Sequence, residues 1–166
     1  MKGIRYAEGL KVLPILAPVD IAAVATSSQA IWLREAQHVT FLVNLGAMTS
    51  DSTDIVTLTV ESSTGQSTAA TDEAVAFTYR LASAVATDSM GAITAATSDG
   101  LAMAATTYDN KSLVIDVDPA YIAGKDTDAQ YLRLVLTPTS DVASFLVSAT
   151  AIIEPRYPGN SMNAAT

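Results

Sequence analysis

Three features of the sequence predict an all-β protein that folds as a single-domain, jelly-roll-like β-sandwich. Short segments with alternating apolar and polar side chains recur along the chain, as in strands that bury one face. Clusters of Gly, Ser, Thr and Asp separate these segments and are typical of turns. The 166 residues suffice for one core, and the chain has no cysteine that could form a disulfide or a zinc-thiolate site.

The segment 130–137 is the clearest strand in the sequence. Leu132, Leu134 and Leu136 fall on one face of it, because side chains alternate with a period of two. The opposite face carries Arg133, whose charge must reach water or a partner. We therefore expect a central strand with one face in the core.

About eight strands are expected in a domain formed by residues 21–153. They lie at 21–26, 30–33, 38–44, 54–61, 75–81, 112–117, 130–137 and 142–153. One short helical turn follows Asp118, because Asp118 can cap it, Pro119 suits its first position and Gly124 can end it. The Ala- and Thr-rich stretch 82–107 has no strong period, so we expect it to contain weak strands or to carry a function.

Two extended arms flank this domain, at residues 1–20 and 154–166. Pro14 and Pro18 favour extended backbone in the first arm, which is too apolar for a solvated tail. We expect this arm to lie on its own domain or, as the favoured interpretation, across a neighbouring subunit. The predicted contacts with another subunit are Tyr6, Leu10, Val12, Leu13, Ile15, Leu16, Arg156 and Tyr157.

The charge and hydropathy of the chain argue against two classes of partner. A formal net charge of −8 repels nucleic acid. No run of apolar residues is long enough to predict a membrane-spanning helix. Basic residues precede an apolar run near the N-terminus, as in a secretion signal, but Pro14, Pro18 and Asp20 interrupt that run. We therefore expect the protein to be made in the cytoplasm, without nucleic-acid or membrane partners.

The sequence predicts no catalytic, cofactor-binding or metal-binding residue, and hence no enzyme. His38 is the lone histidine, and no G-x-S-x-G nucleophile elbow is present. Trp32 is distant in sequence from the tyrosines, so no aromatic platform for a sugar is predicted. Three acidic pairs lack the spacing of an EF-hand loop and are expected to be solvated turn residues. They are Asp51 with Asp54, Asp116 with Asp118, and Asp126 with Asp128, and a bound ion at the first pair stays an open alternative.

Several segments resemble small structural proteins of tailed-bacteriophage virions. They are I-R-Y-A-E-G-L-K-V-L-P-I-L-A-P (4–18), F-L-V-N-L-G-A-M-T-S-D-S-T-D (41–54), F-T-Y-R-L-A-S-A-V-A-T-D-S-M-G-A (77–92) and E-P-R-Y-P-G-N (154–160). With D-V-D-P-A-Y-I (116–122) and Y-L-R-L-V-L-T (131–137), the domain is similar to capsid decoration, or cement, proteins. The likeness spans most of the chain, and its motifs are structural.

The resemblance implies a non-enzymatic protein that binds the outer surface of an assembled phage head and stabilises it. Its partners would be the major capsid protein and further copies of itself, with a trimer favoured over a dimer. It would be made in the host cytoplasm and end on the outside of the virion. The alternative is a carbohydrate-binding or adhesion module on a virion or cell surface, with the stretch 82–107 as its binding edge.

Overall fold

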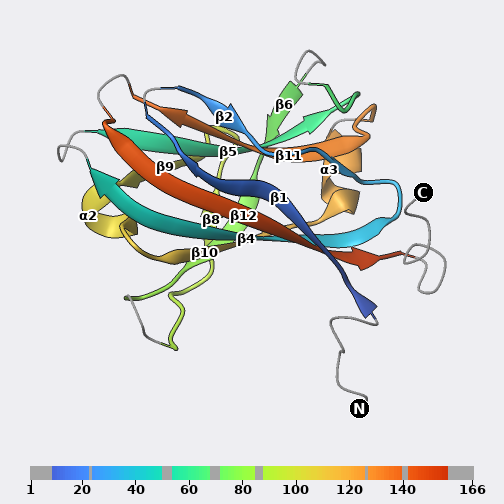
Figure 1. Cartoon of the computed structure of the whole chain (residues 1–166). Helices are drawn as coiled ribbons and strands as arrows, with labels where there is room; N and C mark the ends of the chain where they lie inside the picture. The colour runs from blue at the N-terminus through green and yellow to red at the C-terminus, as the bar shows by residue number, and fades with distance from the viewer. Residues whose placement is uncertain are drawn as a thin grey trace.

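The computed structural model describes residues 9–22, 24–49, 54–67, 72–84, 88–125, 127–139 and 142–156. Within these ranges the chain forms two antiparallel β-sheets packed face to face, with two short helices at opposite ends of the sandwich (Figure 1). The prediction of an all-β sandwich is therefore confirmed.

The first sheet, called sheet A, contains six strands in the order β1-β12-β4-β10-β7-β8. Their bounds are β1 (Lys11–Asp20), β12 (Ser144–Pro155), β4 (Ala36–Thr49), β10 (Ser112–Val117), β7 (Phe77–Leu81) and β8 (Thr94–Ala96). All neighbouring pairs are antiparallel.

The second sheet, called sheet B, is built on two long central strands, β11 (Tyr131–Pro138) and β5 (Ile55–Ser63). Two short strands, β2 (Thr26–Ser27) and β3 (Ile31–Trp32), pair with β11. The strands β6 (Asp72–Val75) and β9 (Leu101–Ala104) pair with β5.

The chain alternates between the two sheets in the manner of a jelly roll. It passes from β1 to the β2 and β3 pair, then to β4, to β5 and β6, to β10, to β11 and back to β12. The order β1-β12-β4-β10 thus faces the order β2/β3-β11-β5-β6, which is the eight-strand pattern of two Greek keys. Strands β7, β8 and β9 are additions between β6 and β10.

The core lies between the sheets and follows the alternation expected from the sequence. Leu132, Leu134 and Leu136 of β11 are fully buried, as predicted. Phe41 on β4 and Phe145 on β12 are the largest of the fully buried side chains facing them. Burial of each such side chain contributes about 1.5–3 kcal/mol, so this layer supplies most of the apolar stabilisation.

The structure contains more elements than the sequence predicted. Twelve strands occur in the described residues, four more than the eight predicted: β1 was expected as an extended arm, and β6, β8 and β9 have only three or four residues and no clear period. The stretch 82–107 contains β8, β9 and most of a one-turn helix, α2 (Ala105–Tyr108). The predicted helical turn is α3 (Pro119–Lys125), which Asp118 caps by accepting a hydrogen bond from the Ala120 backbone N–H at 2.8 Å. This helix continues through Gly124 instead of ending there.

The N-terminal segment rests on its own domain along β1, which is one of the two positions expected for it. β1 pairs with β12 and forms an edge of sheet A, visible in blue beside the red β12 in Figure 1. Pro14 and Pro18 lie where this pairing shifts register, in agreement with the preference of proline for edge strands and bulges. Residues 1–8 and 157–166 lie outside the described ranges. No described helix is long and apolar enough to cross a membrane.

Candidate interaction surface

The predicted contact residues of β1 divide between the core and the surface. Ile15 is 4% exposed and belongs to the core, and Leu13 and Leu16 pack against that core while partly buried. Leu10 is half-buried just before the strand. Val12 is 50% exposed, so among these five residues it presents the largest share of its side chain to a partner.

The remaining predicted contacts lie at the chain ends. The Arg156 side chain is exposed, and its backbone N–H donates a hydrogen bond to the Glu35 carbonyl oxygen at 2.7 Å. This bond holds the end of β12 beside the start of β4. Tyr6 and Tyr157 lie outside the described residues. Their contacts, and those of Arg156 with another subunit, stay predictions.

The outer face of sheet A carries an aliphatic strip that crosses four strands. We define the strip as Val12 of β1, Ile152 of β12, Leu42 of β4 and Val114 of β10. Val12 is the register partner of Ile152, and Leu42 is the register partner of Val114. On β4, the register partner of Ile152 is Thr40, which lies two residues before Leu42 on the same face of the strand. The pair of Val12 and Ile152 therefore lies diagonally next to the pair of Leu42 and Val114. The strip is therefore continuous from the sheet edge to β10.

A second exposed aliphatic side chain, Leu146 of β12, lies on the same face nearer the start of that strand. It is opposite Gly46 on β4, where a Cβ atom would come within 2.8 Å of the Leu146 Cβ atom. Glycine is therefore required beside Leu146, which stays about half exposed. An exposed leucine packed over a glycine adds apolar area to the outer face.

The polar groups next to the strip are hydrogen-bonded to one another. The Asp116 carboxylate on β10 accepts a hydrogen bond from the Thr40 hydroxyl at 2.7 Å, and His38 Nε2 lies 3.2 Å from the same oxygen. The lone histidine thus has Asp116 as a structural partner. These contacts hold the polar side chains at the border of the strip, and the four residues of the strip itself carry no charge.

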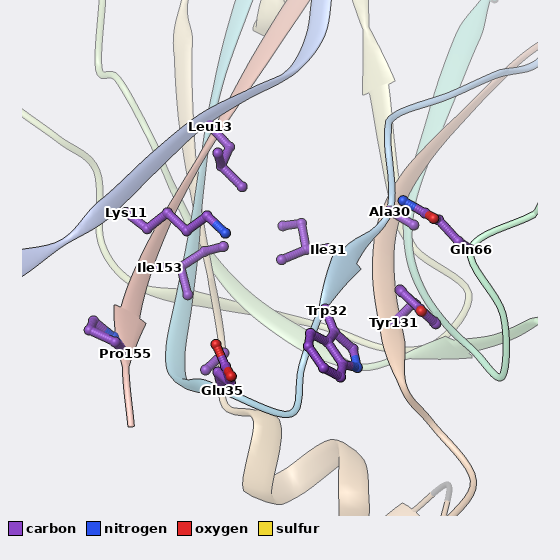
Figure 2. A pocket seen from close by; sticks show the side chains of 11 residues that line it. Lys11, Leu13, Ala30, Ile31, Trp32, Glu35, Gln66, Tyr131, Ile153 and Pro155 are labelled. Atoms are coloured by element: carbon purple, nitrogen blue, oxygen red, sulfur yellow. The ribbon is translucent and has the colours of Figure 1, made fainter. Parts of the chain in front are cut away.

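A hollow of about 220 Å³ lies between β1 and β12 of sheet A and β3 and β11 of sheet B. Figure 2 shows Lys11, Leu13 and Ile153 of β1 and β12 on one side, and Ile31, Trp32 and Tyr131 of β3 and β11 on the other. The lining comprises Lys11, Leu13, Ala30, Ile31, Trp32, Glu35, Ala36, Gln66, Tyr131, Ile153 and Pro155. The floor is aliphatic, and the charged and aromatic groups stand around it.

Sequence reasoning missed the aromatic pair of this hollow. Trp32 and Tyr131 are register partners on the antiparallel strands β3 and β11, so their side chains lie next to each other. The expectation that Trp32 stands apart from the tyrosines was therefore wrong. Separation along the chain says nothing about register, and β3 has only two residues, too few to show a period. The Arg34 guanidinium lies 5.8 Å from the centre of the Trp32 ring as a cation–π contact.

A second hollow, of about 280 Å³, lies between sheet A and α3. β7, β8, β10 and α3 contribute to it, with Ala76, Phe77 and Ala96 among its apolar lining. Tyr121 of α3 stands at its border and is 46% exposed. Part of this hollow is formed by the stretch 82–107, where the adhesion alternative placed its binding edge.

Arg133 of β11 is 3% exposed, and its charge is neutralised by two carboxylates. Its guanidinium contacts the Asp72 carboxylate of β6, and its Nε lies 3.8 Å from the Glu61 carboxylate of β5. Asp72 Oδ1 and Arg133 Nε lack a hydrogen-bond partner within the described ranges. The partner that we expected from the sequence for the Arg133 charge is thus supplied by the same chain.

The acidic pairs considered as ion ligands are spread over the molecule. Asp54 is buried, Asp116 bonds to Thr40, and Asp118 caps α3. Asp51 and Asp126 lie outside the described residues. Across the described ranges, no three His, Cys, Asp or Glu side chains converge as a metal site would require.

The fold defines the protein as a jelly-roll β-sandwich with added strands on both sheets. No family model matches the chain, and no curated protein matches it. Among solved structures, it is similar to a chain in the structure of infectious bursal disease virus Gt strain, with 9% sequence identity and a TM-score of 0.28. The similarity covers 89% of this chain and 40% of that one. At this TM-score the likeness supports no inference about function.

Proposed function

We propose that this protein is a non-enzymatic structural component of a virion, which binds the outer surface of a tailed-phage capsid and stabilises the head as a decoration protein. The aliphatic strip on the outer face of sheet A is the observation that carries the proposal. Val12 is 50% exposed in the isolated chain, and Ile152, Leu42 and Val114 are each partly exposed on the same face. Burying them against a partner surface would be favourable in proportion to the area covered.

Binding of this kind needs no pocket. A sheet face is broad and rigid, and the strip provides aliphatic contact with few charges to desolvate. The interface of one copy would be modest in area. Many copies on one shell, each in contact with its neighbours, would convert modest affinity into stable attachment.

The net charge favours the outside of a capsid over the inside. A chain with a charge of −8 is repelled by packaged DNA. The bordering groups Asp116 and His38 are satisfied by each other, so the strip can be covered without leaving them unpaired. The resemblance of the sequence to phage cement proteins points to the same location, with the major capsid protein as partner.

Copies of the protein would associate through side chains on sheet faces and at the chain ends more readily than by pairing their edge strands. β1 is an edge strand of sheet A, but its prolines and its two register shifts interrupt the row of donors that another strand would need. We therefore propose that a homo-oligomer, a trimer in preference to a dimer, forms through side chains of Val12 and of the two terminal segments.

The proposal is tested by co-sedimentation of purified protein with expanded heads of the encoding phage that lack it. Val114→Lys places an ammonium group in the strip and should weaken binding roughly tenfold or more. Val135→Lys is the matched control, because Val135 is a half-buried valine on the outer face of sheet B. Failure of the unmodified protein to sediment with heads, or equal losses in both variants, would refute the proposed role of the strip.

A further inference from the structure

We propose that the hollow between β1 and β3 binds one neutral pyranose residue of a glycan, with Trp32 and Tyr131 as its aromatic platform. This site lies away from the outer strip and from the stretch 82–107. It would give the protein a binding activity in addition to capsid attachment, and it holds whether or not the protein decorates a head.

The aromatic pair provides the stacking surface. Trp32 is 46% exposed although it belongs to a strand, and its register partner Tyr131 is half-buried beside it. The face of an aromatic ring is electron-rich. The C–H groups on one face of a pyranose carry partial positive charge and can stack on such a ring. The Arg34 guanidinium lies 5.8 Å from the centre of the indole ring, and this cation–π contact favours one orientation of the ring.

Polar side chains around the platform can recognise hydroxyl groups. Lys11 donates hydrogen bonds, the Glu35 carboxylate accepts them, and the Gln66 amide does both. Within the described part of the chain, neither Lys11 nor Glu35 forms an ion pair. A pyranose presents hydroxyl groups around its rim and C–H groups on its faces, which matches polar groups arranged around an aromatic and aliphatic centre.

The volume of the hollow limits the bound part of the ligand to one sugar ring, and its floor is formed before the ligand binds. Ile31 and Ile153 at its base are nearly fully buried, so the floor is already formed. A volume of about 220 Å³ is below the roughly 300–1,000 Å³ of pockets for drug-sized ligands. One sugar ring fills such a space, and the rest of a glycan would extend into solvent.

The charges favour a neutral sugar. One cation and one anion, Lys11 and Glu35, face the hollow, so their local charges cancel. The chain as a whole is acidic, with a net charge of −8, and repels polyanionic glycans. A cation and an anion in the same hollow can hydrogen-bond a polar neutral ring without favouring an acidic one.

Trp32 is the single tryptophan of the chain, so its fluorescence reports on this site alone. The full-length protein is titrated with glucose, galactose, mannose, N-acetylglucosamine and N-acetylgalactosamine, with glucuronic acid as an acidic comparison. A glycan array and isothermal titration calorimetry provide independent readouts. We expect a saturable change in Trp32 emission with at least one neutral sugar, and tighter binding of an oligosaccharide ending in it.

Variants distinguish sugar binding in this hollow from nonspecific binding elsewhere on the protein. Tyr131→Ala and Glu35→Gln should each weaken binding roughly tenfold. Trp32→Phe, assayed by calorimetry, should weaken it less than Trp32→Ala, because a smaller ring remains. Tyr121→Ala is the matched control, since Tyr121 is also 46% exposed but borders the other hollow. Its affinity for the sugar should be unchanged. Circular dichroism confirms that each variant is folded.

The proposal is overturned by the absence of a saturable response to every neutral sugar in both fluorescence and calorimetry. A response confined to glucuronic acid overturns the neutral class. Equal affinity in the protein and in folded Tyr131→Ala overturns the assignment of the site. If Trp32 responds to capsids and to no sugar, the hollow is a protein contact and the sugar assignment is wrong.

Discussion

Arg133 on β11 and Asp72 on β6 form an ion pair across β5, the strand that separates them in sheet B. Glu61 on β5 lies directly between, 3.8 Å from the Arg133 Nε atom. The cluster therefore ties three neighbouring strands on the outer side of the sheet. β6 has only four residues, and the ion pair adds to its backbone pairing with β5.

Replacing the arginine should destabilise the protein strongly. In Arg133→Met, Asp72 and Glu61 keep their charges in a largely buried setting without a cation. We expect the free energy of unfolding to fall by about 2–4 kcal/mol, at the lower side of the usual range because both carboxylates retain some exposure. Urea denaturation measures the loss.

The matched comparison is the variant that removes all three charges, Arg133→Met with Asp72→Asn and Glu61→Gln. Neutralising the whole cluster avoids the unpaired carboxylates, so much of the stability should return. A triple variant that is less stable than Arg133→Met alone would show that the charges themselves, and not their pairing, maintain the fold.

Two residues of β1 should behave in opposite ways. Ile15→Ala removes a core side chain and should lower the unfolding free energy by about 2–4 kcal/mol. Val12→Thr changes an exposed side chain and should leave stability within about 0.5 kcal/mol, while weakening assembly and head binding. Thermal denaturation and head co-sedimentation separate the effects. Normal head binding by Val12→Thr would remove Val12 from the proposed contact.

Gly100 and Gly124 should respond very differently to alanine. Gly100 has φ +86°, and a Cβ atom there would lie 2.6 Å from the Leu58 carbonyl oxygen. Gly100→Ala should cost about 2–4 kcal/mol through backbone strain and this clash. Gly124 lies within α3 with open space around it, so Gly124→Ala should be neutral or stabilise by up to about 1 kcal/mol. Chemical denaturation of both variants, side by side, is the measurement.

Tyr108 should make stability fall at high pH. Burial raises the pKa of Tyr108 from 10.0 to about 12, and a hydrogen bond and charge interaction with Tyr79 add to the shift. Because the folded pKa lies above the unfolded one, this stability is complete below pH 10.0 and is lost as the pH rises toward about 12. Tyr108→Phe has no phenol to ionise, so its stability should not fall for this reason. The unfolding free energy of the unmodified protein minus that of Tyr108→Phe should therefore decrease as the pH rises from 10.0 to about 12.

The terminal segments should govern the oligomeric state. Arg156 lies near the start of the second of them and is held at the Glu35 carbonyl oxygen through its backbone, while its side chain is exposed. The full chain carrying Tyr6→Ala, Tyr157→Ala and Arg156→Ala should dissociate to a smaller species at concentrations where the unmodified protein is oligomeric. Light scattering measures the mass. An unchanged mass would exclude these side chains as anchors, and Arg80→Ala, on the face of β7, serves as the control.

Much of the fold follows from local pattern. The alternation in 54–61 and 130–137 is a property of consecutive residues, so it identifies strands and their buried face without knowledge of partners. Asp118 followed by Pro119 identifies the start of α3 for the same reason, because capping involves only neighbouring residues. The short strand β6 was not predicted separately, and β8 and β9 were expected only as weak strands somewhere within 82–107, since a segment of three or four residues shows too little periodicity to place it.

The sequence alone determined that this protein is an acidic, cysteine-free all-β sandwich with a leucine-faced central strand. Only the tertiary structure decided that Ile15 lies in the core while Val12 faces out, that the aliphatic strip crosses four strands, and that Trp32 stands beside Tyr131. The physical reason is register. Alternation assigns each side chain to one face of its own strand, but which residues become neighbours depends on how distant strands align their hydrogen bonds.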